Sequence, residues 1–420
     1  MKLAVLGLWH LGTVVSTGLS TLKGNKIYCF DENRIIENFK KKKIPINEKN
    51  IENILKKNIN KSIFFSSDFS KLKEFKTVWV TYDTKIDGDD YSNFNHIFKK
   101  LKFSFKYLSK NTLVIISSQL PIGSIKKLEN YDNKILKKKI RFVYIPENLR
   151  LGNGLEIFLK ASDMIIGLRK ITDKKQVCKT INGINSKKHF VSIETAEMTK
   201  HVINSYLACS IALINEISMI ASKHNVSFSD LEKSVKTDKR ISSYSYLRPG
   251  NSFSGGTLAR DLNFLIKEGK KNNQNTKLLK SIISSNNSHS GWVENIINEQ
   301  KNISKKKILQ IGLSYVSGTT TLRRSFPYEV FKRLKNKIYI KILDDFLKEK
   351  SDEVLRFKDY FESSNSTNKY DIIIIFNNDN NFSLIKKFTK KNTLIVDINN
   401  FYKKDCLLHK IKYKSLENET

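Results

Sequence analysis

The sequence contains little cysteine, and its four cysteines stand apart from one another. Cys29, Cys178, Cys209 and Cys406 form no CxxC pair, and their spacing indicates no metal site. Cys29 and Cys209 lie in apolar stretches, where a thiol packs like a small hydrophobic side chain. Because this usage is typical of a reducing compartment, we expect a cytoplasmic protein that holds no metal ion.

Long hydrophobic runs and internal repeats are also missing. The first apolar run, residues 3–8, is broken at Gly7 and again at Gly12, and no small-residue cleavage site follows. This pattern predicts a first strand rather than a signal peptide. Later runs such as 372–376 are too short to cross a bilayer. We therefore expect no membrane contact, and no repeat of solenoid period is present.

Acidic residues are scarce relative to basic ones. The chain has 41 acidic and 75 basic residues, which gives a formal charge of +34. The lysines are spread over the chain, and their short clusters at 40–43, 137–139 and 305–307 are typical of solvated faces and linkers. We therefore expect no nucleic-acid partner, although the positive field would attract an anionic small molecule.

The length of 420 residues suits two or three domains. In residues 1–190, short apolar runs alternate with helix-length segments, which predicts right-handed βαβ units and a parallel sheet. The expected strands of this domain are 3–6, 26–30, 62–65, 78–80, 113–116 and 142–145.

Residues 191–304 have a different pattern. Apolar residues recur at helical spacing from Ile203 to Ala221, which predicts a long central helix that could form the core of a homodimer. Strand-like runs return in residues 305–420, at 308–312, 338–343, 372–376 and 394–396. The expected fold is α/β, with two Rossmann-like doubly wound parallel-sheet domains joined by a central helical region.

A glycine-rich turn follows the first expected strand. Gly7-Leu8-Trp9-His10-Leu11-Gly12 is a GxGxxG pattern in which Trp9 replaces the middle glycine. Asp31 ends the second expected strand, where an acidic residue bonds the ribose hydroxyls of a dinucleotide. A carboxylate there would repel a 2′-phosphate, so the pattern favours NAD over NADP. The alternative is a plain strand–turn–helix corner that binds nothing.

Two further features could carry chemistry. Lys200 and Asn204 lie four residues apart on the expected central helix and share one face. Such a pair can hold a substrate oxygen and help to take its proton, or it can be ordinary helix surface. The loop 248–257 is rich in glycine and serine and could wrap a sugar or a phosphate, or be a plain surface loop.

The order of these motifs resembles the UDP-glucose/GDP-mannose dehydrogenase family over roughly residues 1–405. The resemblance rests on the segments 7–12, 146–150, 196–200, 215–216, 249–261 and 312–325, together with Asp31 and Asn204. It implies an NAD-binding Rossmann domain, a central dimerisation region and a C-terminal domain that helps to bind a nucleotide sugar. It also implies a role in polysaccharide biosynthesis.

The resemblance implies roles for individual residues. Glu147 matches the acid/base glutamate, Lys200 and Asn204 match the pair that holds the reacting oxygen, and Asp261 matches the aspartate of the cysteine loop. Arg323 matches a substrate arginine that the partner subunit supplies in the family, and Glu48 matches a residue near the lid of the first domain. The remaining matched positions lie in the cofactor loop, in the turn at Gln119 and along the substrate loops at Asn148, Leu149, Arg150, Phe253, Gly255 and Gly256.

The departures from the family pattern concern the second half of its reaction. In the family a C6 alcohol is oxidised to the aldehyde, a cysteine captures the aldehyde, and a second hydride leaves a thioester that water hydrolyses. Here Thr257 stands at the cysteine position, and a threonine hydroxyl is a poor nucleophile without an activating base. The other replacements are Gln119 for a threonine that positions water, Leu151 for an acid, Val316 for a substrate lysine and Phe326 for a proline.

The residues matched to the first hydride transfer are all present. We therefore favour an NAD-dependent oxidoreductase acting on a nucleotide sugar, with the hypothesis that it stops after two electrons. One alternative is a catalytically silent homologue that binds NAD or a nucleotide sugar and serves as a regulatory or scaffold subunit. The other is a hydroxyacid dehydrogenase, a related class that also uses Lys and Asn on a helix.

Overall fold

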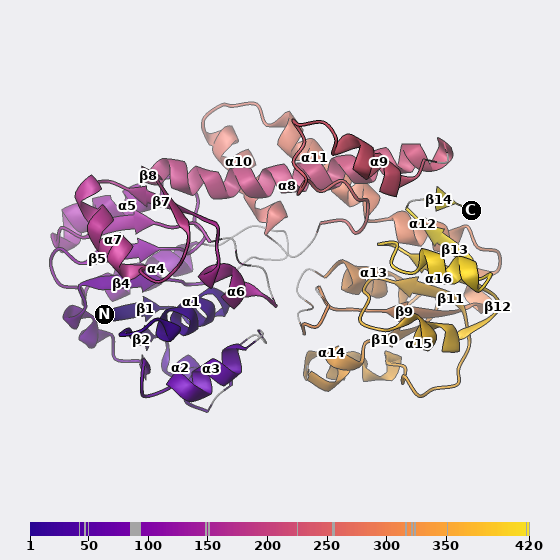
Figure 1. Cartoon of the computed structure of the whole chain (residues 1–420), viewed down its shortest axis with the longest axis horizontal. Coiled ribbons are helices and arrows are strands. Elements are labelled where there is room, and N and C mark those ends of the chain that lie inside the picture. The colour runs from indigo at the N-terminus through magenta and orange to yellow at the C-terminus, as the bar shows by residue number, and fades with distance from the viewer. Residues whose placement is uncertain are drawn as a thin grey trace. The chain divides into compact units, whose positions relative to one another are not determined.

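The structure is a computed structural model that describes most of the chain as two compact units, residues 1–203 and 204–420. The residues outside the description are 42, 46, 47, 49, 85–93, 148, 150, 151, 225, 254–256, 316, 321, 323, 324, 351, 417 and 420. The α/β architecture with two Rossmann-like sheets and a helical region between them in sequence is confirmed (Figure 1).

The first unit is built on a sheet of eight described strands. Their order is β3-β2-β1-β4-β5-β6-β7-β8, and the first six follow the doubly wound pattern of dinucleotide-binding domains. All neighbours are parallel except β6 and β7. The strands are β1 (Lys2–Leu6), β2 (Lys26–Phe30), β3 (Ile63–Ser66), β4 (Thr77–Val80), β5 (Leu113–Ile116), β6 (Arg141–Tyr144), β7 (Asp163–Leu168) and β8 (Lys187–Ser192).

Helices cover both faces of this sheet (Figure 1). One hydrophobic core joins it to α1 (His10–Thr21), α2 (Asn33–Lys40), α3 (Ile51–Asn58), α6 (Gly154–Leu159) and α7 (Lys174–Thr180). A second core joins the other face to α4 (Asn95–Phe105), α5 (Ser124–Tyr131) and the start of α8. Burial on both faces explains why these strands are continuous apolar runs rather than alternating ones.

The boundary between the units falls within the long helix α8 (Ile193–Ala221). Beyond it, α8 packs on α10 (Leu258–Lys271) and α11 (Lys277–His289) through one small core, and on α9 (Phe228–Val235) through another. Residues 193–224 are long and apolar enough, by length and composition, to cross a membrane. Polar side chains of α8 accept backbone N–H groups elsewhere in the protein, at the start of α5 and in the loop before α10.

The second sheet has the order β10-β9-β11-β12-β13-β14 in the described residues. Its strands are β9 (Lys307–Ile311), β10 (Tyr339–Leu343), β11 (Tyr370–Ile375), β12 (Thr389–Asp397), β13 (Lys412–Ser415) and β14 (Asn418–Glu419), of which only the last pair is antiparallel. Its helices are α13 (Phe326–Leu334), α14 (Asp345–Lys350), α15 (Phe382–Lys387) and α16 (Lys403–Leu408). The preceding helix α12 (Trp292–Asn298) packs into the core of this sheet. The division into domains 1–190, 191–304 and 305–420 stays our proposal.

Candidate functional site

The glycines of the first turn bring α1 close to the sheet. Gly7 has a φ of +94°, and a Cβ there would lie 2.6 Å from the ring of Tyr82. A Cβ on Gly12 would lie 1.7 Å from the carbonyl oxygen of Gly7. Both positions therefore require glycine. Trp9, at the place of the missing middle glycine, immediately precedes α1 and is 44% exposed.

Asp31 fixes this corner from the end of β2. Its carboxylate accepts hydrogen bonds from the backbone N–H of Leu8 and of Glu32, both at 2.8 Å. Burial raises the pKa of Asp31, although these two bonds and the nearby ammonium of Lys100 oppose the shift. The carboxyl ends of β1, β2 and β4 and the start of α1 thus meet at one edge, which fits the phosphates and ribose of a dinucleotide.

Glu48 joins the cofactor loop to a second loop of the same unit. Its carboxylate lies 2.6 Å from Nε2 of His10 and accepts the backbone N–H groups of Gly152 at 2.8 Å and Gly154 at 2.9 Å. Burial alone would raise the pKa of Glu48, but these three bonds outweigh it and hold the pKa below its ordinary value. The ionised carboxylate therefore anchors the start of α6 to the start of α1.

The segment after β6 carries the predicted acid/base residue. Glu147 is half-buried three residues beyond β6, and Leu149 packs against the core on the α1 side of the sheet. Asn148, Arg150 and Leu151 lie outside the described residues. On the neighbouring turn, the backbone carbonyl of Gln119 accepts the hydroxyl of Thr84 at 2.5 Å.

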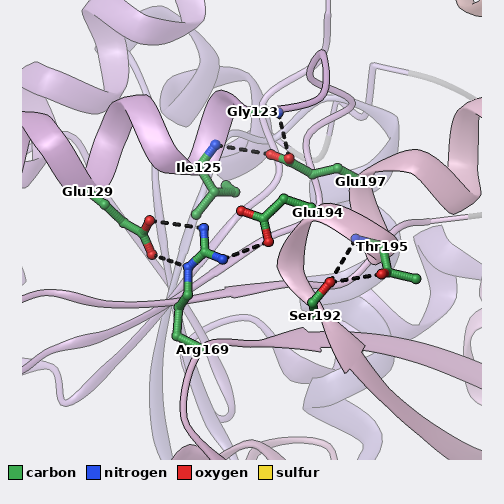
Figure 2. A network of polar contacts seen from close by, with 8 residues as sticks. All are labelled: Gly123, Ile125, Glu129, Arg169, Ser192, Glu194, Thr195 and Glu197. Atoms are coloured by element: carbon green, nitrogen blue, oxygen red, sulfur yellow. Dashed lines mark hydrogen bonds and ion pairs between the residues drawn. The ribbon is translucent and has the colours of Figure 1, made fainter.

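A buried carboxylate fixes α8 to α5 (Figure 2). Glu197, on α8, accepts the backbone N–H of Gly123 at 2.7 Å and of Ile125 at 3.0 Å, at the start of α5. Burial raises the pKa of Glu197, although both backbone bonds oppose the shift. Since Lys200 follows Glu197 by three residues, this contact sets where Lys200 stands relative to the turn that carries Gln119.

Arg169 makes a second connection between the same two helices (Figure 2). Its guanidinium bonds both carboxylate oxygens of Glu129, at 2.7 and 3.0 Å, and one oxygen of Glu194 at 2.7 Å. Glu129 is in α5 and Glu194 is in the first turn of α8. The bidentate pairing of Arg169 with Glu129 fixes the orientation of the two side chains as well as the distance between them.

Lys200 and Asn204 are both buried and lie one turn apart on α8. Lys200 is in the first compact unit and Asn204 begins the second. Within the second unit, the amide of Asn204 donates to the carboxylate of Asp261, which is fully buried in the first turn of α10. The guanidinium of Arg260 lies 3.9 Å from the same carboxylate. The structure therefore brings two of the predicted catalytic residues into contact.

The loop before α10 is held by side-chain amides. Asn286 accepts the backbone N–H of Phe253 at 2.8 Å and donates to its carbonyl at 3.1 Å. Asn215 accepts the N–H of Gly250 at 2.9 Å, and Nε2 of His289 lies 2.9 Å from the Gly250 carbonyl. Burial lowers the pKa of His289, although the bond to the Gly250 carbonyl opposes the shift. These contacts preorganise the loop.

The predicted substrate loop ends at Thr257. This half-buried residue immediately precedes α10, and its hydroxyl makes no capping bond to that helix. Gly255 and Gly256 lie outside the described residues, as does Ser254. Phe253 packs partly buried against the core shared by α8, α10 and α11.

The second sheet repeats the corner of the first. Gly312, with a φ of +85°, follows β9, and the N–H of Leu313 donates to the carboxylate of Asp344, at the end of β10, at 2.9 Å. Burial raises the pKa of Asp344, as it does for Asp31, against the same kind of backbone bonds. Val316 and the predicted substrate residue Arg323 lie outside the described residues, and Phe326 begins α13 as a core residue.

Several of these residues escaped the reading of the sequence. Asn286 and His289 lie in an asparagine-rich stretch with no motif, and Lys100 lies in one of many lysine-rich helices. Glu197, by contrast, lies in the segment 196–200 on which the family resemblance rests, and the sequence already placed it as a polar group on the central helix. Among the described residues, no group of three or more His, Cys, Asp or Glu side chains could hold a metal ion.

Comparison with known proteins agrees with this geometry. Residues 1–183 match the NAD-binding domain of the UDP-glucose/GDP-mannose dehydrogenase family, and residues 194–288 match its central domain. The chain is similar to the UDP-glucose 6-dehydrogenase of Rickettsia bellii (strain RML369-C), with 27% identity over 96% of each chain.

Solved structures share the fold. A UDP-glucose dehydrogenase from Pyrobaculum islandicum superposes with a TM-score of 0.85 at 19% identity, covering 99% of this chain and 97% of that one. A UDP-D-ManNAc dehydrogenase from Pyrococcus horikoshii has a TM-score of 0.82 at 20% identity, with both chains fully covered. The two matched domains span most of the sequence, and one of them is the domain that binds NAD. The chain therefore belongs to the UDP-glucose/GDP-mannose dehydrogenase family, whose members are NAD-dependent dehydrogenases of nucleotide sugars.

Proposed function

We propose that this protein oxidises the C6 alcohol of a nucleotide sugar to the aldehyde and releases the aldehyde after this single two-electron step. NAD, bound at the corner of Gly7, Gly12 and Asp31, supplies the hydride acceptor. The observation that carries the proposal is the residue at the start of α10, which is Thr257 rather than a cysteine.

The proposed first step needs only residues that are present. The buried Lys200 and Asn204 share one face of α8, where they would hold the reacting oxygen. The bond from Asn204 to Asp261 supports this role, because it fixes the amide and leaves its carbonyl oxygen as an acceptor. Glu147 would serve as the acid or base, and Asn148, Leu149, Arg150, Phe253, Gly255, Gly256 and Arg323 would contact the sugar or the nucleotide.

The proposed stop at the aldehyde follows from the weak nucleophilicity of Thr257. Capture of an aldehyde needs a good nucleophile near neutral pH. A threonine hydroxyl is a poor nucleophile without a base to activate it. The cysteines elsewhere are poor substitutes. Burial raises the pKa of Cys29 and of Cys406 to about 12, and Cys178 lies in α7 of the first unit. Cys209 follows Lys200 by nine residues, about two and a half helical turns, which places it on the face of α8 opposite Lys200, where it packs against the core shared with α10 and α11.

The test is the number of NADH molecules formed per sugar consumed. The protein is incubated with NAD and, in turn, UDP-glucose, GDP-mannose and UDP-N-acetylmannosamine, and the product is identified by mass spectrometry. We expect one NADH and an aldehyde. Two NADH and a uronic acid would contradict the proposal, and no NADH from a sugar that demonstrably binds would favour the silent homologue instead.

We also propose that the protein is a homodimer in the cytoplasm. The support is a stripe of exposed apolar side chains along one face of α8, formed by Val202, Tyr206, Leu213, Ile217 and Ile220. These residues fall within a narrow arc of the helix at 100° per residue, and exposed stripes of this kind mark contact surfaces. A second copy would cover the stripe by the same face.

Charge placed on the stripe should abolish the dimer. We expect the wild type to sediment as a dimer at micromolar concentration, and the variant Leu213→Glu/Ile220→Glu to sediment as a monomer with unchanged circular dichroism. Leu278→Glu is the matched control, because Leu278 is an equally exposed apolar residue on α11. A monomeric wild type, or a dimer in the double variant, would rule out this interface.

A further inference from the structure

Two neighbouring carboxylates at the end of β2 have different surroundings. Asp31 is 3% exposed, and its two oxygens accept the backbone N–H groups of Leu8 and Glu32. The side chain of Glu32, which immediately precedes α2, is 64% exposed. A ligand that arrives from solvent therefore reaches the carboxylate of Glu32 more readily than that of Asp31.

One lysine stands beside both carboxylates. The Nζ atom of Lys100, on α4, lies 2.7 Å from Oε1 of Glu32 and 4.0 Å from Oδ1 of Asp31. It also lies over the ring of Tyr82, 5.2 Å from the ring centroid. Because Tyr82 packs against Gly7, the contact with the ring would keep Lys100 at the cofactor corner even if Glu32 were absent.

The charges at this corner decide between a hydroxyl and a phosphate. In a doubly wound sheet the ribose of the dinucleotide lies beyond the end of β2. With the Lys100–Glu32 ion pair intact, the carboxylates of Glu32 and Asp31 surround the single ammonium of Lys100. The corner therefore accepts ribose hydroxyls and repels a 2′-phosphate. Without Glu32, one buried carboxylate and one partly exposed ammonium remain, and the ammonium can bind the phosphate.

We propose that Glu32 is the residue with which this protein distinguishes NAD from NADP. Lys100 is then a cation able to bind the 2′-phosphate, and its ion pair with Glu32 prevents that binding. Asp31 also positions the loop at Leu8 through its backbone bonds, so its replacement should weaken the binding of both cofactors. The inference rests on NAD binding by this family and is independent of the sugar chemistry proposed above.

The test measures dissociation constants for NAD and NADP by titration calorimetry, without any sugar. We expect Glu32→Gln to tighten NADP binding about tenfold or more and to change NAD binding by less than about threefold. In the Lys100→Met background, only the relief of repulsion by Glu32 remains, so the gain in NADP binding should be smaller by about threefold or more. Matched controls are Glu37→Gln, on α2 and paired with Lys40, and the exposed Lys99→Met on α4; neither should alter the preference.

The outcomes separate the possible errors. Unchanged NADP binding in Glu32→Gln would overturn the assignment of Glu32. An equal gain in the Lys100→Met background would place the phosphate partner elsewhere, for instance at Arg34, and would overturn the role of Lys100. A wild type that binds neither dinucleotide would overturn the inference together with the cofactor assignment.

Discussion

Replacement of Thr257 by cysteine should convert the proposed two-electron enzyme into a four-electron one. With a sugar that the wild type oxidises once, Thr257→Cys should form two NADH per sugar and release an acid in place of an aldehyde. The change in stoichiometry, from one to two, is large and is independent of how much protein is active.

The second oxidation in Thr257→Cys would follow the chemistry of a cysteine-bound aldehyde. The cysteine thiolate adds to the aldehyde carbon and takes up a proton, and the resulting thiohemiacetal gives a hydride to a second NAD and a proton to solvent, which leaves a thioester. Water then hydrolyses the thioester to the acid and the free thiol, slowly because Gln119 replaces the threonine that positions water in the family. The position suits a thiolate, because residue 257 immediately precedes α10, and a helix N-terminus lowers the pKa of a thiol. Asp261, in the first turn of the same helix, matches the aspartate of the family's cysteine loop.

The control is Thr257→Ser, which keeps a hydroxyl and should still form one NADH per sugar. Modification by iodoacetamide, followed by mass spectrometry, should label the new cysteine and return the stoichiometry to one. A Thr257→Cys protein that binds the sugar, forms the aldehyde and still stops at one NADH would show that residue 257 is not placed for the second step.

Removal of the Lys200 ammonium should abolish the first oxidation. We expect Lys200→Ala to lower kcat by about 100-fold to 10,000-fold, the range that a positioned proton-transfer group contributes. The side chain is buried on α8, whereas the cofactor corner is formed by the Gly7–Gly12 turn before and at the start of α1. The dissociation constant for NAD should therefore stay within about threefold of the wild-type value.

Two further variants separate chemistry from charge. Lys200→Arg keeps the positive charge but cannot release a proton near neutral pH, so it should be nearly as inactive as the alanine variant. Lys223→Ala removes an exposed lysine just beyond the end of α8 and should be fully active. Substantial activity in Lys200→Ala, with NADH formation followed by absorbance, would remove Lys200 from the reaction.

The sequence predicted most strands because parallel strands that are buried on both faces appear as unbroken apolar runs. Each of the six strands predicted for the first domain is present, with ends shifted by one residue at most. The strands β7 and β8 were missed. β8 begins Lys187-Lys188-His189 and no residue in it is fully buried, so its pattern is that of a surface segment. The antiparallel pairing of β6 with β7 depends on contacts between distant residues, and no local pattern records it.

The same distinction applies to the site. Gly7, Gly12 and Asp31 could be found because one turn and one strand end hold them at a fixed spacing. Glu32 and Lys100 meet across the fold from distant parts of the sequence, and the clamp of Asn286 on Phe253 is equally nonlocal. In a chain with 75 basic residues, a single important lysine carries no local signal.

The recurrence of one corner in both sheets bears on how such sequences are annotated. Asp31 and Asp344 perform the same task, since each buried carboxylate accepts the backbone N–H of the residue just after the glycine that follows the neighbouring strand. An acid at that place is therefore a marker of the scaffold first and of a bound ribose only second. By the proposal above, the exposed residue that follows the acid, Glu32 in the first sheet, is the one that distinguishes the cofactor.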